Sequence, residues 1–366
     1  MTEEEYMKRA IELAKKGIGY TNPNPMVGAV IVKENRIIGE GYHKRCGQLH
    51  AERNAFASLM ESAEGATLYV TLEPCCHYGK TPPCTEAIVE NKIARVVIGS
   101  RDPNPLVSGK GAKYLREHGI EVVEDFLREE CDRINQVFFH YISTKTPYVV
   151  LKYAMTADGK IATKTGDSKW ITGEASREKV QYMRHKYMGI MAGIGTVLAD
   201  DPMLNVRIDG LKSPVRIICD SKLRIPIESQ IVKTACRYRT IVACTQADEE
   251  KKKILEQNNV QVEVISESKE KNIDMKSLMV RLGELGIDSV FVEGGGTIND
   301  SLLRAGLINR VEVFVAPKLF GGEDAKSPME GLGIEKVADA PLFVLEDIER
   351  IEDDVCLSYV YRKIYI

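Results

Sequence analysis

Hydrophobic and polar positions follow alternating helical and strand patterns through the first 145 residues. Residues 3–17, EEEYMKRAIELAKKG, have the spacing of an amphipathic helix that ends at a glycine. The apolar pattern of residues 26–43 predicts two strands joined by a polar turn at Lys33–Asn35. Further strands are predicted at 66–72, 94–100 and 120–124, with helices at 51–63, 84–92 and 112–119. Because strands alternate with helices, we expect a mostly parallel sheet covered on both faces.

A second series of elements begins after residue 147. A helical stretch at 125–144 leads into Lys145-Thr146-Pro147, where we place a domain boundary. The tail at 355–366 alternates as an edge strand does. The chain is therefore expected to form two α/β domains, 1–145 and 146–366. In the second domain, strands are predicted at 148–155, 189–195, 215–220, 240–245, 260–265, 288–295 and 310–320, and helices at 173–187, 247–259 and 298–306.

Composition and charge narrow the class of protein. A chain of 366 residues with 44% hydrophobic and 28% charged residues is typical of two folded domains. The 50 basic and 53 acidic residues nearly balance, which argues against nucleic acid or an anionic membrane as a partner. No apolar run approaches the roughly 18 residues that would span a bilayer. The acidic start, MTEEEYMKRA, has no features of a signal peptide, so we expect a cytoplasmic protein.

The nine cysteines include three within ten residues, and these three lie beside a histidine-rich part of the chain. His50-Ala51-Glu52 lies at a predicted helix start, Pro74-Cys75 follows a predicted strand, and Cys84 begins another predicted helix. The order H-x-E, P-C and C is typical of zinc-dependent nucleobase deaminases. The cysteines outside this group are expected to be mostly small buried residues: Cys46, Cys131, Cys219, Cys236, Cys244 and Cys356.

The chemistry of such a deaminase explains these residue types. A catalytic zinc ion needs three protein ligands and one open position for water, and His50, Cys75 and Cys84 could supply the three ligands. Glu52 could carry a proton from the attacking water to the departing amine. Cys76 is excluded as a ligand because adjacent residues rarely bind one tetrahedral ion. The alternatives are a buried histidine with two structural cysteines, or a structural zinc site, which usually has four protein ligands.

The segment between the two ligand cysteines is longer than the P-C-x-x-C of generic cytidine and tRNA adenosine deaminases. Here it reads CCHYGKTPPC and adds the polar residues His77, Tyr78 and Lys80. These side chains suit an unusual, phosphorylated substrate beside the metal. The alternative is an ordinary polar surface loop.

Longer motifs extend across both halves. TNPNPMVGAV, GYHKRCGQLHAE, VTLEPCCHYGKTPPC and RDPNPLVSGKG resemble the deaminase half of the bifunctional riboflavin-biosynthesis deaminase–reductases. LKYAMTADGKIATKTGDSKWIT, GIGTVLADDP, FVEGGGTINDSLL and APKLFGG resemble the reductase half of that family. The resemblance implies an N-terminal cytidine-deaminase-like α/β/α domain and a C-terminal dihydrofolate-reductase-like α/β domain.

The same resemblance implies two consecutive reactions on one small phosphorylated pyrimidine. The first is hydrolytic deamination of 2,5-diamino-6-ribosylamino-4(3H)-pyrimidinone 5′-phosphate, with one zinc ion per chain. The second is NADPH-dependent reduction of the ribosyl side chain, with hydride delivered to C1′, to give 5-amino-6-ribitylamino-uracil 5′-phosphate. We expect a homo-oligomer, either a dimer or a tetramer, with no nucleic acid or membrane partner.

The resemblance also implies roles for residues of the first domain. It assigns zinc to His50, Cys75 and Cys84, and proton transfer to Glu52. An amide such as Asn24 can read the edge of a base, and a lysine such as Lys80 can meet a phosphate. Residues matching positions around the deaminase substrate are Asn24, His43, His77 and Lys80.

The second domain lacks the G-x-G-x-x-G fingerprint of dinucleotide-binding folds. Glycine turns instead follow two predicted strands, at 193–196 and 294–297. Glycine allows close backbone approach, and a helix N-terminus offers free N–H groups to phosphate, although such turns are often only turns. The resemblance implies NADPH contacts at Ala154, Trp170, Thr196, Asp200, Ser221, Gly295, Gly296, Thr297, Ile298, Asn299, Asp300 and Ser301.

The resemblance places a second set of residues at the reductase substrate. Arg184 and Arg207 suit a phosphate because guanidinium binds it bidentately, although both could be solvated surface arginines. Lys152 is a candidate near the reacting sugar, with an exposed strand lysine as the alternative. Trp170, the only tryptophan, could be a site wall or a core residue. The full set is Lys152, Ser168, Arg184, Leu204, Arg207 and Glu293.

Two other functions compete with the bifunctional enzyme. One is a base deaminase of the tRNA or cytidine type that carries a nucleotide-binding appendage. The neutral charge and the long cysteine segment weigh against it. The other is a zinc-stabilised protein that senses pyrimidine nucleotides. Glu52 weighs against that function, because sensing needs no proton carrier.

Overall fold

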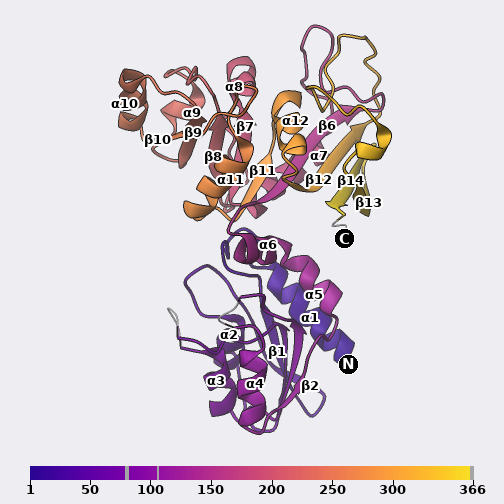
Figure 1. The fold of residues 1–366 in the computed structure, drawn as a ribbon. Coiled ribbons are helices and arrows are strands. Elements are labelled where there is room, and N and C mark those ends of the chain that lie inside the picture. Colours follow the sequence, from indigo (N-terminus) through magenta and orange to yellow (C-terminus); the bar gives the residue numbers. More distant parts are fainter. Residues whose placement is uncertain (79–81, 105–106, 363–366) are drawn as a thin grey trace. The chain divides into compact units, whose positions relative to one another are not determined.

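The computed structural model describes residues 1–78, 82–104 and 107–362. The chain forms two compact units, Met1–Lys145 and Thr146–Ile366 (Figure 1). Within the described residues, no helix combines the length and the apolar character that crossing a membrane requires.

The first unit is built on a five-stranded mixed sheet with the order β2-β1-β3-β4-β5. β1 runs antiparallel to both of its neighbours, whereas β3, β4 and β5 are mutually parallel. β2, β3, β4 and β5 therefore point in the same direction, as expected of a mostly parallel sheet, and β1 is the exception among the described strands. The hairpin at Glu34 and Asn35, both with positive φ, reverses the chain between β1 and β2. The strands are β1 (Gly28–Lys33), β2 (Arg36–Tyr42), β3 (Thr67–Leu72), β4 (Arg95–Ser100) and β5 (Glu121–Val123).

Helices cover both faces of this sheet, because alternate residues of each strand point to opposite sides. On β1, Val30 packs in a core cluster with residues of α1 and α5, whereas Ala29 and Ile31 pack with residues of α2, α3 and α4. The result is the expected three-layer α/β/α arrangement. The helices are α1 (Glu3–Lys15), α2 (Ala51–Ala57), α3 (Cys84–Glu90), α4 (Lys110–Glu117), α5 (Arg128–Ile134) and α6 (Gln136–Thr144).

The second unit contains a nine-stranded sheet with the order β10-β9-β8-β7-β11-β6-β12-β14-β13. The strands from β10 to β12 are parallel, and β14 and β13 add antiparallel pairs. The strands are β6 (Tyr148–Thr156), β7 (Gly189–Gly193), β8 (Val215–Cys219), β9 (Thr240–Cys244), β10 (Val260–Val264), β11 (Ser289–Val292), β12 (Ile308–Ala316), β13 (Phe343–Ile351) and β14 (Asp354–Tyr361).

The expectation that the C-terminal tail forms an edge strand is wrong. The tail strand β14 lies between β12 and β13, and the edge is β13. β13 escaped prediction because both of its faces are largely exposed, so FVLEDIERI lacks the alternation of a half-buried strand.

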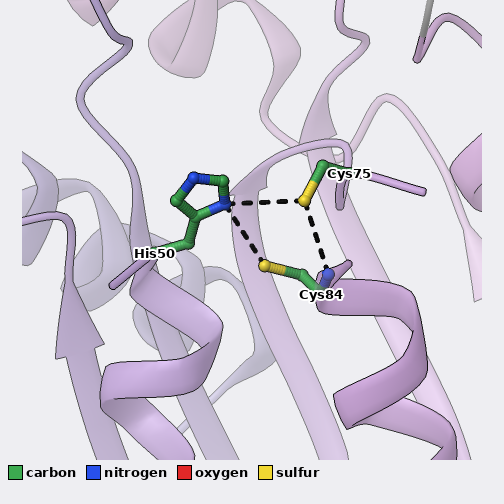
Figure 2. A group of neighbouring side chains, drawn as sticks. All are labelled: His50, Cys75 and Cys84. Carbon is green, nitrogen blue, oxygen red and sulfur yellow. Dashed lines mark hydrogen bonds between the residues drawn. The ribbon is translucent and has the colours of Figure 1, made fainter. Parts of the chain in front are cut away.

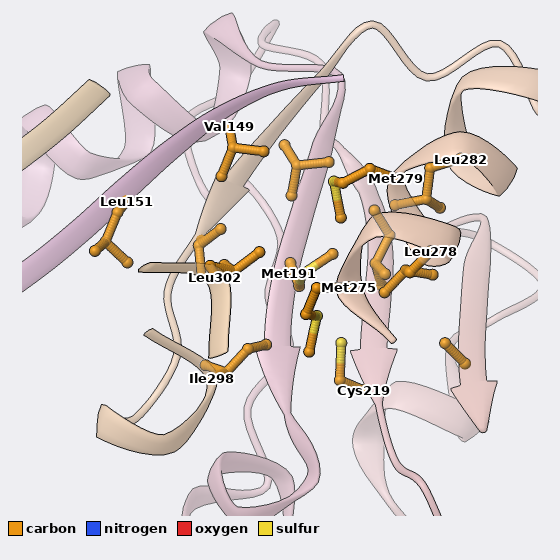
Figure 3. Packing of buried hydrophobic residues seen from close by; sticks show 14 of the residues in the cluster. Val149, Leu151, Met191, Cys219, Met275, Leu278, Met279, Leu282, Ile298 and Leu302 are labelled. Carbon is orange, nitrogen blue, oxygen red and sulfur yellow. The ribbon is translucent and has the colours of Figure 1, made fainter. Parts of the chain in front are cut away.

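The core of the second unit lies on both sides of its sheet. Figure 3 shows α11 and α12 packed over Val149, Leu151 and Met191 on one face. Ile190 and Ala192 point to the opposite face and pack with residues of α8, α9 and α10. The helices are α7 (Glu174–Lys186), α8 (Ile194–Asp200), α9 (Gln230–Lys233), α10 (Glu249–Gln257), α11 (Met275–Glu284) and α12 (Gly296–Arg304), with a 3₁₀ turn at Val337–Asp339.

Parallel pairing determines where a ligand site can form in this unit. The carboxyl ends of parallel strands share one edge of the sheet, where open α/β sheets bind ligands. The turn from β7 to α8, the residue Ser221 after β8, and the Glu293–Gly295 turn after β11 all lie at such ends.

Candidate active sites of the two units

Three side chains far apart in sequence converge in the first unit. The Nδ1 atom of His50 lies 3.5 Å from Sγ of Cys75 and 3.4 Å from Sγ of Cys84 (Figure 2). The ligand atoms of all three residues lie within 4.8 Å of one another, and Cys76 does not belong to this group. The structure thus brings together the predicted metal ligands.

Local structure explains why these side chains meet. His50 is the N-cap residue of α2, and Cys84 is the first residue of α3, as the sequence predicted. Cys75 follows β3, and its Sγ accepts a hydrogen bond from the backbone N–H of Cys84 at 3.4 Å. The turn before Cys75 is held by Glu73, whose carboxylate accepts from the N–H groups of Gly109, Gly111 and Ala112 around the start of α4.

The donor set fits a zinc ion. Zinc bonds of about 2.3 Å to sulfur and about 2.05 Å to nitrogen, at a tetrahedral angle, put the ligand atoms about 3.6 Å apart. The two measured nitrogen–sulfur distances are 3.5 and 3.4 Å. Three protein ligands also leave the fourth tetrahedral position open, as in catalytic sites.

Burial and close partners shift the acidity of this group. Hydrogen bonds from Cys84 and His50 lower the pKa of Cys75 below its usual value, which favours the thiolate form that binds metal. Glu52 is only 3% exposed, and burial raises the pKa of its carboxyl group above the usual value. Glu52 lines the same cavity as His50 and Cys75, so a buried proton acceptor lies beside the metal-ligand group.

This cavity has a volume of about 420 Å³ and contains three of the predicted substrate residues, Asn24, His43 and His77. The ring of His43 approaches Leu49 O through Nδ1 at 3.0 Å and the Asn24 amide nitrogen through Nε2 at 3.3 Å. Burial lowers the pKa of His43, which favours a neutral ring that donates to the carbonyl and accepts from the amide. The fourth predicted residue, Lys80, lies outside the described residues.

His77 lines the cavity. Its Nδ1 is buried, and within the described part of the chain it has no hydrogen-bond partner.

The sequence analysis missed part of the cavity wall. Asp102 and Asn104 belong to the RDPNP motif, which could have indicated them, and burial raises the pKa of Asp102 to about 6. The residues from α6 belong to no motif, and nothing in the local sequence indicates them. The lining residues that were not predicted include Cys46, Gln48, Asp102, Asn104, Phe138, Tyr141 and Ile142.

In the second unit, Lys152, Arg184 and Glu293 form a cluster of charges. Arg184 binds Glu293 bidentately, with Nε–Oε1 at 2.6 Å and Nη2–Oε2 at 3.1 Å. Lys152 Nζ lies 3.8 Å from Oε2 of Glu293. All three side chains are at most 15% exposed, so the alternatives of a solvated Arg184 and an exposed strand Lys152 are wrong.

The cluster is linked to the segment that carries two further predicted substrate residues. Arg184 Nη1 donates to Asn205 O at 3.0 Å, next to Leu204, which is buried and has a φ of 48°. Arg207 has an exposed side chain, while its N–H donates to Gln181 Oε1 at 3.0 Å. Ser168, the remaining residue of the set, is partly exposed.

The two glycine turns leave space at some positions but are covered at Gly294 and Gly296, where an added Cβ would meet Ile298 and Glu330. A Cβ added at Gly193, Gly195 or Gly295 would meet no atom within 4 Å. Gly295 is the N-cap residue of α12, so the first N–H groups of that helix lie at this turn.

The residues expected to contact NADPH differ in what their side chains can reach. Thr297 is exposed, and Ala154, Thr196, Ser221 and Ser301 are partly exposed. Ile298, Asn299 and Asp300 are buried, with Asn299 bonded to Pro328 O and Asp300 to Arg304. Glu330 covers Gly296, and its N–H donates to Gly296 O at 3.1 Å, so Gly295 and Thr297 are the more accessible positions of this turn.

Trp170 and Asp200 belong to an exposed part of this expected set. Trp170 is 58% exposed, so the alternative of a core residue is wrong, and the Arg177 guanidinium lies 4.9 Å from its ring centre. Asp200 pairs with Lys169 at 2.9 Å, which connects the loop that carries Trp170 to the end of α8.

Comparisons with known proteins find relatives for both units of the chain. Residues 1–100 match the cytidine and deoxycytidylate deaminase zinc-binding region, and residues 147–357 match the RibD C-terminal domain. Riboflavin biosynthesis protein RibD of Actinobacillus pleuropneumoniae is 53% identical, with 98% of this chain and 96% of that protein covered. The Escherichia coli RibD is 41% identical, with 98% and 100% covered.

Solved structures show the same relationship over the full length. A diaminohydroxyphosphoribosylaminopyrimidine deaminase/5-amino-6-(5-phosphoribosylamino)uracil reductase from Thermotoga maritima is 41% identical, with a TM-score of 0.87 and 98% of each chain covered. Acinetobacter baumannii RibD, form 1, is 38% identical, with a TM-score of 0.88 and 98% and 99% covered. The chain therefore belongs to the RibD family of riboflavin biosynthesis proteins, with a zinc-binding deaminase domain followed by a RibD C-terminal domain.

Proposed function

We propose that this chain deaminates 2,5-diamino-6-ribosylamino-4(3H)-pyrimidinone 5′-phosphate and then reduces the ribosyl side chain of the product with NADPH. The final product would be 5-amino-6-ribitylamino-uracil 5′-phosphate. The observation that carries the proposal is the His50, Cys75 and Cys84 group beside buried Glu52, in a chain related to RibD proteins over both units.

In the deamination, His50, Cys75 and Cys84 would hold one zinc ion. When bound, zinc supplies Lewis-acid activation of the attacking water. Glu52 accepts a proton from that water and delivers it to the departing amino group, so that the ring C–N bond breaks and ammonia leaves. Its raised pKa suits a group that must both accept and release a proton.

The polar cavity wall orients the pyrimidine. In our assignment, the Asn24 amide reads the edge of the base, the neutral ring of His43 orients that amide by accepting from it, and His77 forms part of the wall around the substrate. Lys80 would meet the phosphate as a point charge.

For the reduction, we assign the cofactor to the carboxyl edge of the second sheet, with the two glycine turns near the pyrophosphate. Bound NADPH would supply the hydride for C1′ of the sugar, with the C1′–O4′ bond breaking and O4′ gaining a proton. The NADPH-contacting set remains the one expected from the sequence. Trp170 forms an exposed wall of this site, and Asp200, through Lys169, holds that wall near α8.

The charged cluster would bind the sugar phosphate substrate. Glu293 fixes Arg184 and Lys152, and these two cations hold the pKa of Glu293 below its ordinary value although burial alone would raise it. Arg184 keeps donors on Nη1 and Nη2 that Glu293 and Asn205 do not use. We assign the phosphate to Arg207 and Arg184, and the reacting sugar to Lys152, with Ser168 and Leu204 completing the pocket.

The two competing functions have less support. A tRNA or cytidine deaminase with an appended domain does not account for RibD relatives matched over nearly the whole chain. A nucleotide sensor does not account for the buried carboxylate of Glu52 inside the cavity.

We further propose that the protein is a cytoplasmic homo-oligomer. The support for an oligomer is the edge strand β13, on which Val344, Leu345 and Ile348 are each about half exposed. A second copy could cover these apolar side chains and pair with the free strand edge.

The decisive experiment incubates the zinc-loaded protein with the diaminopyrimidine ribosyl phosphate, with and without NADPH. Ammonia should appear in both reactions, and the nicotinamide absorbance should fall only where NADPH is present and deamination has occurred. Absence of ammonia release would remove the deaminase assignment, and unchanged nicotinamide absorbance would remove the reductase assignment.

A further inference from the structure

Helix α6 forms a wall of the deaminase cavity although it lies far beyond the zinc-binding region in sequence. The match to that region ends at residue 100, whereas Phe138, Tyr141 and Ile142 of α6 line the same cavity as His50 and Glu52. Their spacing of three and four residues places the three side chains on one face of the helix. The cavity therefore combines a general deaminase centre with a wall contributed by another segment.

This wall is held in a defined position. Asn135, the N-cap residue of α6, is 2% exposed and makes two reciprocal hydrogen bonds with the backbone of Met26. The Met26 N–H donates to Asn135 Oδ1 at 2.9 Å, and Asn135 Nδ2 donates to Met26 O at 2.9 Å. Pro25 and Val27, on either side of Met26, also line the cavity. The beginning of α6 is thus joined directly to the segment at 25–27 of the cavity lining.

The exposure of α6 is unusual for an apolar helix. QVFFHYIST contains several large hydrophobic residues, yet none of its side chains is fully buried. Phe138 and Phe139 pack partly against the domain core. Tyr141 and Ile142 are only partly covered by the protein and face a space that a ligand can fill.

We propose that Phe138, Tyr141 and Ile142 are specificity-determining residues of the deaminase site, and that they pack against the pyrimidine ring and its sugar substituent. This inference rests on the proposed deaminase function. A substrate of about 20 non-hydrogen atoms can occupy a pocket of this size and contact more than one of its walls. The polar wall reads the edges of the base, and the apolar wall of α6 supplies contact area for its face.

The test compares Ile142→Ala and Ile142→Val with Val137→Ala, a control on the same helix that lies outside the cavity lining. Ile142 is preferred to Phe138 because Phe138 also packs against the core. Ile142→Ala should raise the deaminase KM roughly tenfold, and Ile142→Val about twofold to threefold, with kcat nearly unchanged. Val137→Ala should leave both parameters unchanged. Zinc content, the thermal midpoint and reductase activity on the deaminated intermediate should match wild type in all three variants.

The outcomes separate the inference from the proposed function. An unchanged KM in Ile142→Ala, while the wild type releases ammonia, would overturn the specificity wall and leave the deaminase assignment in place. Equal changes in the KM of Ile142→Ala and Val137→Ala would show that α6 has only a structural role. Failure of the wild type to release ammonia would contradict the deaminase function itself. If Ile142→Ala does not fold, Ile142→Val still gives the graded change in KM.

Discussion

Two largely buried glutamates differ in their proposed roles because their surroundings shift the pKa of the carboxyl group in opposite directions. Glu52 is buried, and the pKa of its carboxyl group is raised, which suits proton transfer. Glu293 is paired with Arg184 and Lys152, which lower its pKa and keep it anionic. Glu293 therefore serves as a fixed negative charge that organises two cations.

Glu52→Gln should abolish proton transfer while leaving the shape of the cavity nearly intact. We expect ammonia release to fall by about 10²- to 10⁴-fold, because general acid–base catalysis is lost. Zinc content and NADPH oxidation with the deaminated intermediate should stay at wild-type values. Measurement of both activities on one preparation checks this, and loss of both would show that the two halves do not act independently.

Asp102 makes the stability of the first unit depend on pH. Burial raises the pKa of its carboxyl group from 3.8 to about 6, so the folded state favours the protonated form. The resulting stabilisation is complete below about pH 4 and is lost as the pH rises through about 6, with an upper limit of about 3 kcal/mol.

The Asp102→Asn variant isolates this effect, since asparagine does not titrate. Between pH 7 and pH 5, the thermal midpoint of the first unit should rise in wild type relative to the variant. Protonation of the metal ligands affects both proteins alike, so the difference between them reports Asp102. Parallel pH profiles would show that Asp102 does not titrate in this range.

At the scale of elements, the metal-ligand group depends on how α4 supports the turn before Cys75. Gly111 lies in the first turn of α4, and a Cβ at this position would overlap the carbonyl oxygen of Pro74. Its N–H donates to Glu73 at 3.0 Å. The glycine therefore allows the helix and the ligand-bearing turn to approach closely.

Gly111→Ala should separate α4 from this turn. The expected cost is about 1–3 kcal/mol in the stability of the first unit, with weaker zinc binding and slower deamination. Zinc titration and the thermal midpoint measure these effects, and Lys113→Ala, at an exposed position of the same helix, is the control. Wild-type zinc affinity in Gly111→Ala would contradict this role for α4.

Local pattern was sufficient for elements with buried apolar residues and insufficient for the others. The apolar run of β1, the polar turn between β1 and β2, and the helix signals at α1 predicted those elements correctly. The direction of β1 relative to β3 depends on long-range pairing, so the pattern could not show that the sheet is mixed. β13 is solvated on both faces, and its residues therefore carry no periodic signal.

The same distinction applies to the site residues. Zinc chemistry constrains the types and the order of four residues, so a short motif was enough to identify them. These residues are His50, Glu52, Cys75 and Cys84. Ile142 has no such constraint, because a wall residue needs only the correct size and place. That place arises when the Asn135–Met26 contact joins segments 109 positions apart.

At the scale of the whole molecule, the two activities should respond differently to metal removal. The metal-ligand group belongs to the first unit, Met1–Lys145. Chelation should therefore abolish ammonia release and leave reduction of the deaminated intermediate unchanged, and added zinc should restore deamination. Metal analysis should find about one zinc ion per chain. Full deaminase activity in metal-free protein would contradict the zinc assignment.

The short connection between the two units also limits where recombination could exchange one unit for another. α6 ends at Thr144 and β6 begins at Tyr148. Ile142, which lines the deaminase cavity, and Lys152, in the charged cluster of the second unit, are therefore only ten positions apart in sequence. Recombination that exchanges one of the two units therefore has only a short stretch in which the chains can be joined without changing a site residue. A breakpoint near residue 100, where the zinc-binding region ends, would keep every metal ligand but replace both the α6 wall and the α4 support of the turn before Cys75. Chimeras joined there should bind metal only where the incoming segment supplies an equivalent of α4, and their substrate preference should change.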